Sequence, residues 1–119
     1  MGTDAARIGT EQQTDSLFEN LRLELRRGCL TLAVLGQLRQ EHYGYTLRKA
    51  LAERGLAIDE STLYPLLRRL EAQGLLASQW REEDKRNKRF YRLSPEGERM
   101  FSLLLGEWQA LNTAVNNIL

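Results

Sequence analysis

The feature that most constrains this chain is a set of leucines in its middle, spaced as they would be on one buried face of a helix. The set comprises Leu63, Leu66, Leu67 and Leu70, which recur at i, i+3, i+4 and i+7. The opposite face then carries hydroxyls, an aromatic ring, a proline and two guanidinium groups: Ser61, Thr62, Tyr64, Pro65, Arg68 and Arg69. Arginine binds phosphate or guanine, and hydroxyl groups donate to phosphate oxygens. The segment is therefore predicted to be a helix whose outer face meets DNA.

A shorter amphipathic helix is predicted just before it, from Leu47 to Arg54, with Gly55 as its C-cap. The turn that follows offers three candidate caps for the next helix: Asp59, Glu60 and Ser61. With Ser61 as the N-cap, Pro65 falls near the end of the first turn, where a proline disturbs a helix least. Two helices joined by a short turn are the signature of a helix-turn-helix.

A charged β-hairpin is predicted to follow Gly74. The segments Leu75 to Arg81 and Lys88 to Leu93 are predicted strands, and Glu82 to Asn87 is the loop between them. This loop contains no glycine, so the turn type stays open. Six of the 17 cations of the chain lie within it or beside it: Arg81, Lys85, Arg86, Lys88, Arg89 and Arg92. Helix, turn, helix and hairpin is the order of a winged helix-turn-helix.

The net charge gives no independent support for a nucleic-acid partner. The chain has 17 lysines and arginines against 16 aspartates and glutamates, so the electrostatic argument depends on local clustering. The acidic residues Glu82, Glu83 and Asp84 lie beside the basic cluster and make it only moderately positive. With 119 residues, of which 42% are hydrophobic, the chain has material for one core.

The composition also argues against an enzyme. Cys29 and His42 are the only residues of their types, and the chain has no glycine-rich phosphate loop. We therefore expect no disulfide, no metal site, no cofactor and no catalytic centre, and we expect Cys29 to be a small buried apolar residue. No apolar run approaches the ~20 residues of a membrane span and no secretion signal is evident, so we expect a cytoplasmic protein without a membrane partner.

The N-terminal third is predicted to hold a leader and two helices. Residues 1–13 are expected to form a flexible leader. An amphipathic helix from Thr14 to Leu25 follows, with Leu17 and Leu21 on its apolar face as candidates for a dimer interface. A second helix runs from Cys29 to about Glu41 and is central to the core. Gly28 either separates the two helices or bends one continuous helix.

The last helix is predicted to make a dimer. Ser94 suits the N-cap and Pro95 the first helical position. Beyond them an a/d heptad seam of six residues requires a partner: Phe101, Leu104, Trp108, Leu111, Val115 and Ile118. A second copy of the chain explains this seam better than the small core does. The expected organisation is thus a leader at 1–13, a winged helix-turn-helix domain at 14–94 and a C-terminal dimerisation helix at 95–119, in a mainly α fold with a small hairpin.

Three motifs together resemble the PadR family of bacterial transcriptional regulators. They are HYGYTL at 42–47, STLYPLLRRLEAQGL at 61–75 and KRFYRLSPEG at 88–97. The resemblance covers about Leu25 to Leu119, and the short C-terminal segment is similar to that of the short-tailed subgroup, in which one helix makes the dimer. Other winged-helix regulators share the fold but not this combination of motifs.

The resemblance implies a homodimer that binds a pseudo-palindromic double-stranded DNA operator and usually represses transcription. It also implies which side chains contact DNA: Tyr43, Ser61, Thr62, Tyr64, Pro65, Arg68, Lys85, Arg86, Lys88 and Arg89. We add Arg69 to this set with a lower rank, because it either joins this face or pairs with Glu60 or Glu71. Some short-tailed members bind flat aromatic compounds in the dimer cavity through a tryptophan, and Trp108 occupies a similar place here.

Other interpretations of the same residues stay open. The outer face of the 61–71 helix could be a solvated surface, and the basic hairpin an ordinary polar tip. One of Tyr43 and Tyr45 is expected to point inward and the other towards DNA, with no preference between them. The main alternative function is a winged-helix protein-interaction module that does not bind DNA, in which the basic loop grips an acidic protein.

Overall fold

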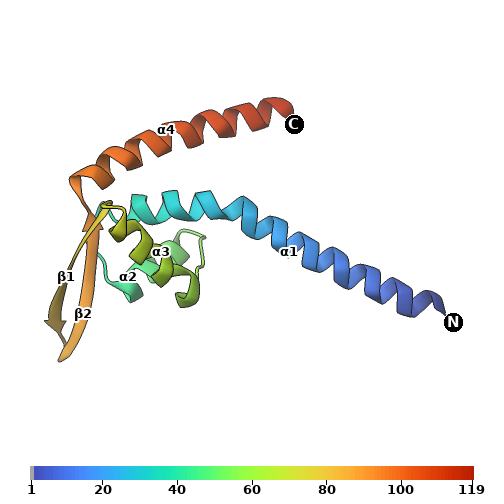
Figure 1. Ribbon diagram of the computed structural model, residues 1–119, viewed down its shortest axis with the longest axis horizontal. Coiled ribbons are helices and arrows are strands. Elements are labelled where there is room, and N and C mark those ends of the chain that lie inside the picture. Colours follow the sequence, from blue (N-terminus) through green and yellow to red (C-terminus); the bar gives the residue numbers. More distant parts are fainter. Residues whose placement is uncertain (1) are drawn as a thin grey trace. The chain divides into compact units, whose positions relative to one another are not determined.

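The computed structural model describes the backbone of residues 2–119 and the side chains of residues 11–119. Its elements, coloured along the chain in Figure 1, are α1 (Gly2–Gln37), α2 (Gly44–Glu53), α3 (Glu60–Ala72), β1 (Leu76–Glu83), β2 (Arg86–Leu93) and α4 (Pro95–Ile118). Contacts divide the chain into two units, Met1–Leu30 and Thr31–Leu119. Helix, turn, helix and hairpin follow one another as predicted, so the expected fold class is confirmed.

The first unit belongs to α1 alone. This helix begins at Gly2, inside the expected leader, so the predicted start at Thr14 was wrong; of the two alternatives at Gly28, the one with a single continuous helix holds, because the helix runs on to Gln37. Half of residues 2–13 are alanine, arginine, glutamate or glutamine, which are strong helix formers and favour the early start. Cys29 is exposed, contrary to our expectation, because no second element of this unit covers it. Met1 lies outside the described residues.

The second unit holds the buried core. The predicted leucine face of α3 is confirmed, since Leu63 and Leu67 have no exposed surface. The end of α1 contributes three fully buried side chains to the same core: Val34, Leu35 and Leu38. Helix α2 adds Leu47 and Leu51, and the hairpin and the residue before it add further apolar side chains: Leu75, Leu76, Tyr91 and Leu93. This core holds the outer face of α3 beside the hairpin.

The N-cap of α3 is the first of the three predicted candidates, not Ser61, with which Pro65 was placed in the first turn. Asp59 is the N-cap, and its carboxylate accepts a hydrogen bond from the Thr62 amide at 2.9 Å. Side-chain hydrogen bonds from Thr62 and Ser61, together with that from the Thr62 amide, lower the pKa of Asp59. Pro65 is consequently inside the helix instead of in its first turn, and its ring nitrogen cannot donate to the Ser61 carbonyl. Helix α2 ends as expected, with Gly55 at a φ of +92°.

The hairpin is longer and its turn tighter than the sequence predicted. Strands β1 and β2 pair in antiparallel register up to Glu83 and Arg86, so only Asp84 and Lys85 form the turn. Both have positive φ, 53° and 64°, as a two-residue type I′ turn requires. The sequence missed this turn because it lacks the usual glycine. At the other side of β2, His42 and Tyr91 exchange backbone hydrogen bonds of 3.0 and 2.8 Å.

The start of α4 is attached to the end of α3. Ser94 is the N-cap as predicted, accepting from the Gly97 amide at 3.0 Å, and Pro95 is the first residue. The Ser94 hydroxyl also donates to the Gly74 carbonyl at 2.6 Å, and its amide donates to Leu75 at 3.0 Å. Among the described residues, no helix is long and apolar enough to cross a membrane.

Candidate nucleic-acid interface

The outer face of α3 is available for contact, as its sequence predicted. Five of the predicted contact residues on it are exposed and Tyr64 is half-buried; the five are Ser61, Thr62, Pro65, Arg68 and Arg69. Each lies opposite the leucine face that the core covers. The early Asp59 cap places Ser61 and Thr62 in the first helical turn, where backbone amides without helical partners point outward. Asp59 already accepts from the Thr62 amide and from the side chains of both residues, so Ser61 and Thr62 lie exposed at a capped helix end.

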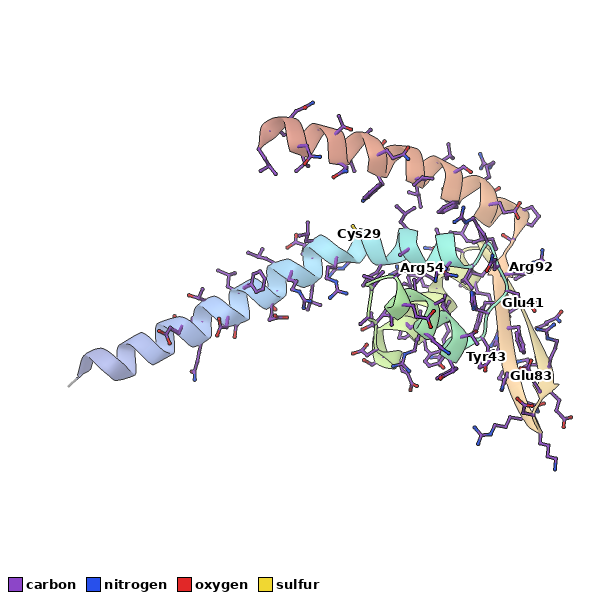
Figure 2. All side chains as sticks on the ribbon, turned by 180° about the vertical axis from the view of Figure 1, so that it is seen from behind. Cys29, Glu41, Tyr43, Arg54, Glu83 and Arg92 are labelled. Atoms are coloured by element: carbon purple, nitrogen blue, oxygen red, sulfur yellow. The ribbon has the colours of Figure 1, made fainter. Side chains whose placement is uncertain are left out.

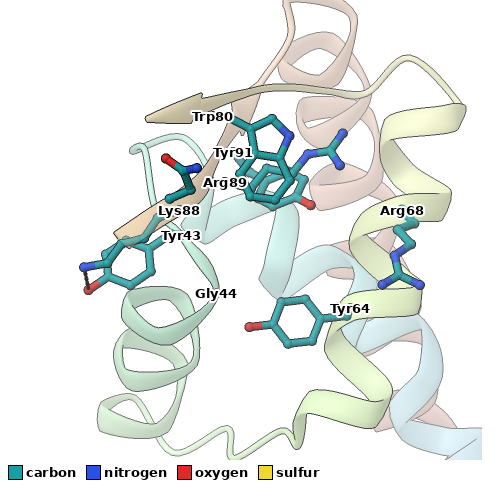
Figure 3. A pocket seen from close by; sticks show the side chains of 9 residues that line it. Tyr43, Gly44, Tyr64, Arg68, Trp80, Lys88, Arg89 and Tyr91 are labelled. Atoms are coloured by element: carbon teal, nitrogen blue, oxygen red, sulfur yellow. Dashed lines mark hydrogen bonds between the residues drawn. The ribbon is translucent and has the colours of Figure 1, made fainter. Parts of the chain in front are cut away.

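Tyr64 reaches from α3 across to the first residue of α2. Figure 3 shows its hydroxyl directed towards Gly44. A Cβ at position 44 would overlap the Tyr64 hydroxyl and lie 2.9 Å from two ring carbons. The helix-turn-helix thus depends on the absence of a side chain at position 44, which lets the Tyr64 ring lie against the start of α2.

A notch of about 370 Å³ separates α3 from the hairpin. Its lining comes from α3, the hairpin and the start of α2 (Figure 3): Tyr43, Gly44, Tyr64, Arg68, Trp80, Asn87, Lys88, Arg89 and Tyr91. Five of these residues were predicted to contact DNA from the sequence. The structure therefore brings side chains that are up to 46 positions apart in the chain, from Tyr43 to Arg89, onto one concave surface.

The two neighbouring tyrosines have different environments. Tyr43 lines the notch, with its ring edge against Phe90 at 5.3 Å between centroids. The Lys88 ammonium lies 4.4 Å from the centre of the Tyr43 ring and 3.4 Å from its hydroxyl. Tyr45 is 62% exposed. Tyr43 therefore lines the notch, and Tyr45 lies exposed beside it, with the two ring centroids 6.4 Å apart.

Carboxylates accompany several cations of the hairpin. Lys88 has Glu83 at 3.8 Å and Asp84 at 3.9 Å, and Arg81 has Glu41 at 2.5 Å. Arg89 is paired with Glu71 of α3 at 2.8 Å. Figure 2 shows Glu83 near the hairpin tip and Arg92 near its base, with Tyr43 beside the hairpin. Within the described residues, three hairpin cations have no carboxylate within 4.0 Å: Lys85, Arg86 and Arg92.

Two residues change rank in the structure. Arg69 lies away from the notch and lines a separate hollow with Leu35 and Leu104. Trp80, which the sequence did not single out, is 65% exposed and lines the notch. A tryptophan between the polar residues Gln79 and Arg81 of a predicted strand was the signal that could have identified it, since tryptophan is normally mostly buried.

The predicted dimer residues divide into two groups. Phe101 packs within its own chain, because its ring lies close to Gly36 and 4.9 Å from the Arg39 guanidinium. Leu104 is 37% exposed and borders the hollow that Arg69 lines. The remaining candidates leave between 43% and 82% of their surface uncovered: Leu17, Leu21, Trp108, Leu111, Val115 and Ile118. In the second unit, the four exposed side chains of α4 are the apolar surface that a second copy would have to cover, and Leu17 and Leu21 are exposed separately on the first unit.

Metal binding finds no support in the part of the chain that the structure describes. No group of three histidine, cysteine, aspartate or glutamate side chains there is arranged to hold an ion. His42, the single histidine, contacts the Gln37 amide at 3.2 Å and the Thr46 hydroxyl at 3.1 Å. Its two ring nitrogens are thus engaged in local hydrogen bonds at the start of α2.

The order of elements and the notch between α3 and the hairpin define a winged helix-turn-helix protein. The chain belongs to the PadR-like family of transcriptional regulators, whose family model matches residues 31–103, so it is a regulator and not an enzyme. A PadR family transcriptional regulator from Eggerthella lenta has a similar structure, with a TM-score of 0.81 and 43% identity over 90% of this chain and 96% of that one.

Two further similar proteins are also transcriptional regulators. A PadR-like transcription factor from Bacteroides fragilis has a TM-score of 0.72 and 32% identity over 84% of this chain and 99% of that one. The transcriptional regulator Rv3488 of Mycobacterium tuberculosis is 40% identical over 75 residues, which are 62% of this chain and 70% of that protein. Both similarities extend beyond the three motifs that first indicated the family.

Proposed function

We propose that this protein is a sequence-specific DNA-binding repressor that acts as a homodimer on a pseudo-palindromic operator. In each subunit α3 enters the major groove, and the hairpin grips the flanking phosphates. Two-fold symmetry sets the two recognition helices about 34 Å apart, one helical turn of DNA. The proposed contacts on the helix-turn-helix are Tyr43, Ser61, Thr62, Tyr64, Pro65 and Arg68. Because the operator lies on the chromosome, the cytoplasm is its proposed location.

The observation that supports this proposal best is the notch that α3 and the hairpin share. Tyr64 and Arg68 line it from α3, and Lys88 lines it from the hairpin. Cations that contact phosphate must be available to it, and their number sets the salt dependence of binding. Lys85 and Arg86 meet this requirement at the hairpin tip, since the structure pairs neither with a described carboxylate within 4.0 Å.

The proposal is tested by selecting fragments of the source genome on the purified protein and sequencing what is retained. We expect an inverted repeat with half-sites one helical turn apart. The affinity for that fragment should exceed the affinity for a scrambled duplex by about a thousandfold or more at physiological salt. Retention of fragments without a shared sequence would contradict sequence-specific binding.

Arg68 and Arg86 separate base contacts from phosphate contacts. Arg68→Ala should cost about 1 to 3 kcal/mol on the operator and much less on random DNA, because a base contact is sequence-specific. Arg86→Ala, the matched loss of one cation, should weaken both duplexes alike and lower the salt slope by about 0.9. Equal losses on both duplexes for Arg68→Ala would remove the base-reading role.

The proposed effector is a flat aromatic compound bound between the two α4 helices. The 43% exposure of Trp108 supports this, since an exposed indole offers a face for stacking. In a Trp80→Phe background Trp108 is the remaining tryptophan, so planar dyes should quench its fluorescence and release the operator. A panel of planar dyes that neither quenches nor releases would contradict the effector proposal.

The alternative function is a protein-interaction module. The carboxylates beside Arg81, Lys88 and Arg89 favour it, because they partly neutralise the hairpin. A salt titration against random duplex DNA discriminates between the two functions, because phosphate contact is the sequence-independent part of DNA binding. Measurable binding at ~50 mM salt that weakens steeply with added salt supports the regulator, and its absence supports the module.

A further inference from the structure

One polar cluster joins the recognition helix to the hairpin. The Glu71 carboxylate, near the end of α3, accepts from the Arg89 guanidinium through one oxygen at 2.8 Å. Its other oxygen accepts from the Ser78 hydroxyl. Ser78 in turn accepts from the Arg89 Nε at 3.1 Å, so the three side chains form a closed ring of hydrogen bonds.

Two aromatic rings lie beside this cluster. The Arg89 guanidinium lies 5.6 Å from the ring centres of both Trp80 and Tyr91. The Glu71 side chain is 27% exposed and that of Arg89 38%. A guanidinium that is partly covered, hydrogen-bonded twice and close to two aromatic faces has little freedom to reorient towards a phosphate. Lys85 and Arg86 at the tip have no such partners among the described residues.

We propose that Glu71, Ser78 and Arg89 are positioning residues that hold the hairpin at a fixed angle to α3. The inference rests on the proposed DNA binding and revises the role of Arg89, which the family resemblance assigns to direct contact. Arg89 serves DNA binding through the geometry of the notch. The two DNA-contacting elements are then preorganised, and binding does not have to order one against the other.

For the Glu71→Gln variant, the positioning role and simple electrostatics predict opposite changes in DNA affinity. Removing a negative charge from a DNA-binding surface should tighten binding, since one repulsive charge is lost. If Glu71 positions the hairpin, the affinity should instead fall by about three- to tenfold, in the lower part of the range of coupling within one network. Glu82→Gln is the control, because it removes a hairpin carboxylate for which no partner among the described residues is recorded, and it should tighten binding.

Arg89→Gln and Ser78→Ala each remove one other member of the same cluster. Each should weaken binding to random duplex DNA while the slope of log affinity against log salt stays that of the wild type. Arg86→Gln is the comparison, and its slope should fall by about 0.9, the value for one phosphate contact. A fall of that size for Arg89→Gln would show that Arg89 contacts phosphate and would overturn the positioning role.

A charge exchange guards against simple unfolding of the single variants. The double variant Glu71→Arg with Arg89→Glu restores an ion pair and should recover at least half of the affinity lost in Arg89→Gln. If Arg89 contacted DNA, the exchange would place a carboxylate at the phosphate and weaken binding further. A wild-type protein that binds no DNA would refute the proposed function, whereas wild-type binding together with tighter binding by Glu71→Gln would refute only the positioning role.

Discussion

The ring of Tyr64 occupies the space that a side chain at Gly44 would fill. Its ring carbons lie 2.9 Å from the position of a Cβ at residue 44, closer than carbon atoms approach without overlap. Tyr64 belongs to α3 and Gly44 to α2, so this contact fixes where the tyrosine hydroxyl lies relative to both helices of the helix-turn-helix.

Gly44→Ala should therefore impair DNA binding more than folding. The added methyl group must displace the half-buried Tyr64 ring towards solvent, and we expect operator affinity to fall by about tenfold, equivalent to ~1.4 kcal/mol. Binding to the selected operator fragment and the thermal midpoint would be measured together. Gly28→Ala is the control, since nothing lies within 4 Å of its Cβ position; it should stabilise α1 by about 0.5 to 1 kcal/mol. Undiminished operator affinity in Gly44→Ala would contradict the positioning of Tyr64.

Lys85 in the hairpin turn supplies a positive charge but lowers the stability of the folded chain. Lys85 has a φ of 64°, a conformation that costs a residue with a Cβ about 1 kcal/mol relative to glycine. Lys85→Gly should raise the free energy of unfolding by about 0.5 to 1 kcal/mol and at the same time weaken DNA binding. Denaturant unfolding and a salt titration on duplex DNA would measure the two effects.

Arg86→Gly provides the matched comparison for that turn. It also removes one cation, but from a position within β2, where glycine lowers stability by up to about 1 kcal/mol. The two variants should therefore change stability in opposite directions and DNA affinity in the same direction. A lower stability for Lys85→Gly would show that its backbone conformation is not strained.

Operator binding should depend on the exposed seam of α4. Leu111 is 55% exposed and Trp108 43%, so a charge at position 111 meets water in a monomer and an apolar surface in a dimer. Leu111→Arg should shift the sedimentation coefficient to that of a monomer and lower operator affinity by more than about tenfold, because two half-sites no longer bind together. Asn112→Arg, one position along the same helix, should leave the dimer intact. A monomeric Leu111→Arg protein with full operator affinity would refute the dimer.

His42 should make stability fall in mildly acidic solution. Burial lowers the pKa of His42, and the positive charge of Arg54 lowers it further. The unfolded chain therefore takes up this proton first, below about 6.5, the usual pKa of imidazole. Stability contributed by the neutral ring is present above that pH and is lost as the pH falls towards the lowered pKa. In His42→Gln the urea concentration at the unfolding midpoint should depend less on pH between pH 7 and 5.5. A pH dependence equal to that of the wild type would contradict this role.

The periodic features of the chain could be predicted from sequence because each depends on local spacing. The leucine face around Leu63, the Ser94 cap and the two strands follow from rules that involve a few neighbouring residues. The apolar residues around Trp108 have the heptad spacing of a helix–helix interface. The spacing alone does not show which of them contact their own chain. Phe101 turned out to pack beside Gly36, a contact between distant segments.

The rest depended on interactions between elements. The residues around Gly44 do not show that the Tyr64 ring packs against it, and the hairpin sequence does not show that Arg89 is paired with Glu71. The type I′ turn at Asp84 and Lys85 was missed because the register of β1 on β2 imposes positive φ on residues that do not favour it. Charge clusters identified the interface region, while the pairing of each charge required the fold.

Ser94 anchors the start of α4 to the residues at the end of α3. Hydrogen bonds from Ser94 to Gly74 and Leu75 tie the first turn of α4 to the residues that directly follow α3. The part of α4 beyond Leu104 holds 14 residues and is about 21 Å long, so a tilt of roughly 5° there displaces its far end by about 2 Å. In the proposed dimer, a molecule wedged beside Trp108 would change the reach between the two half-sites without touching a DNA-contacting residue.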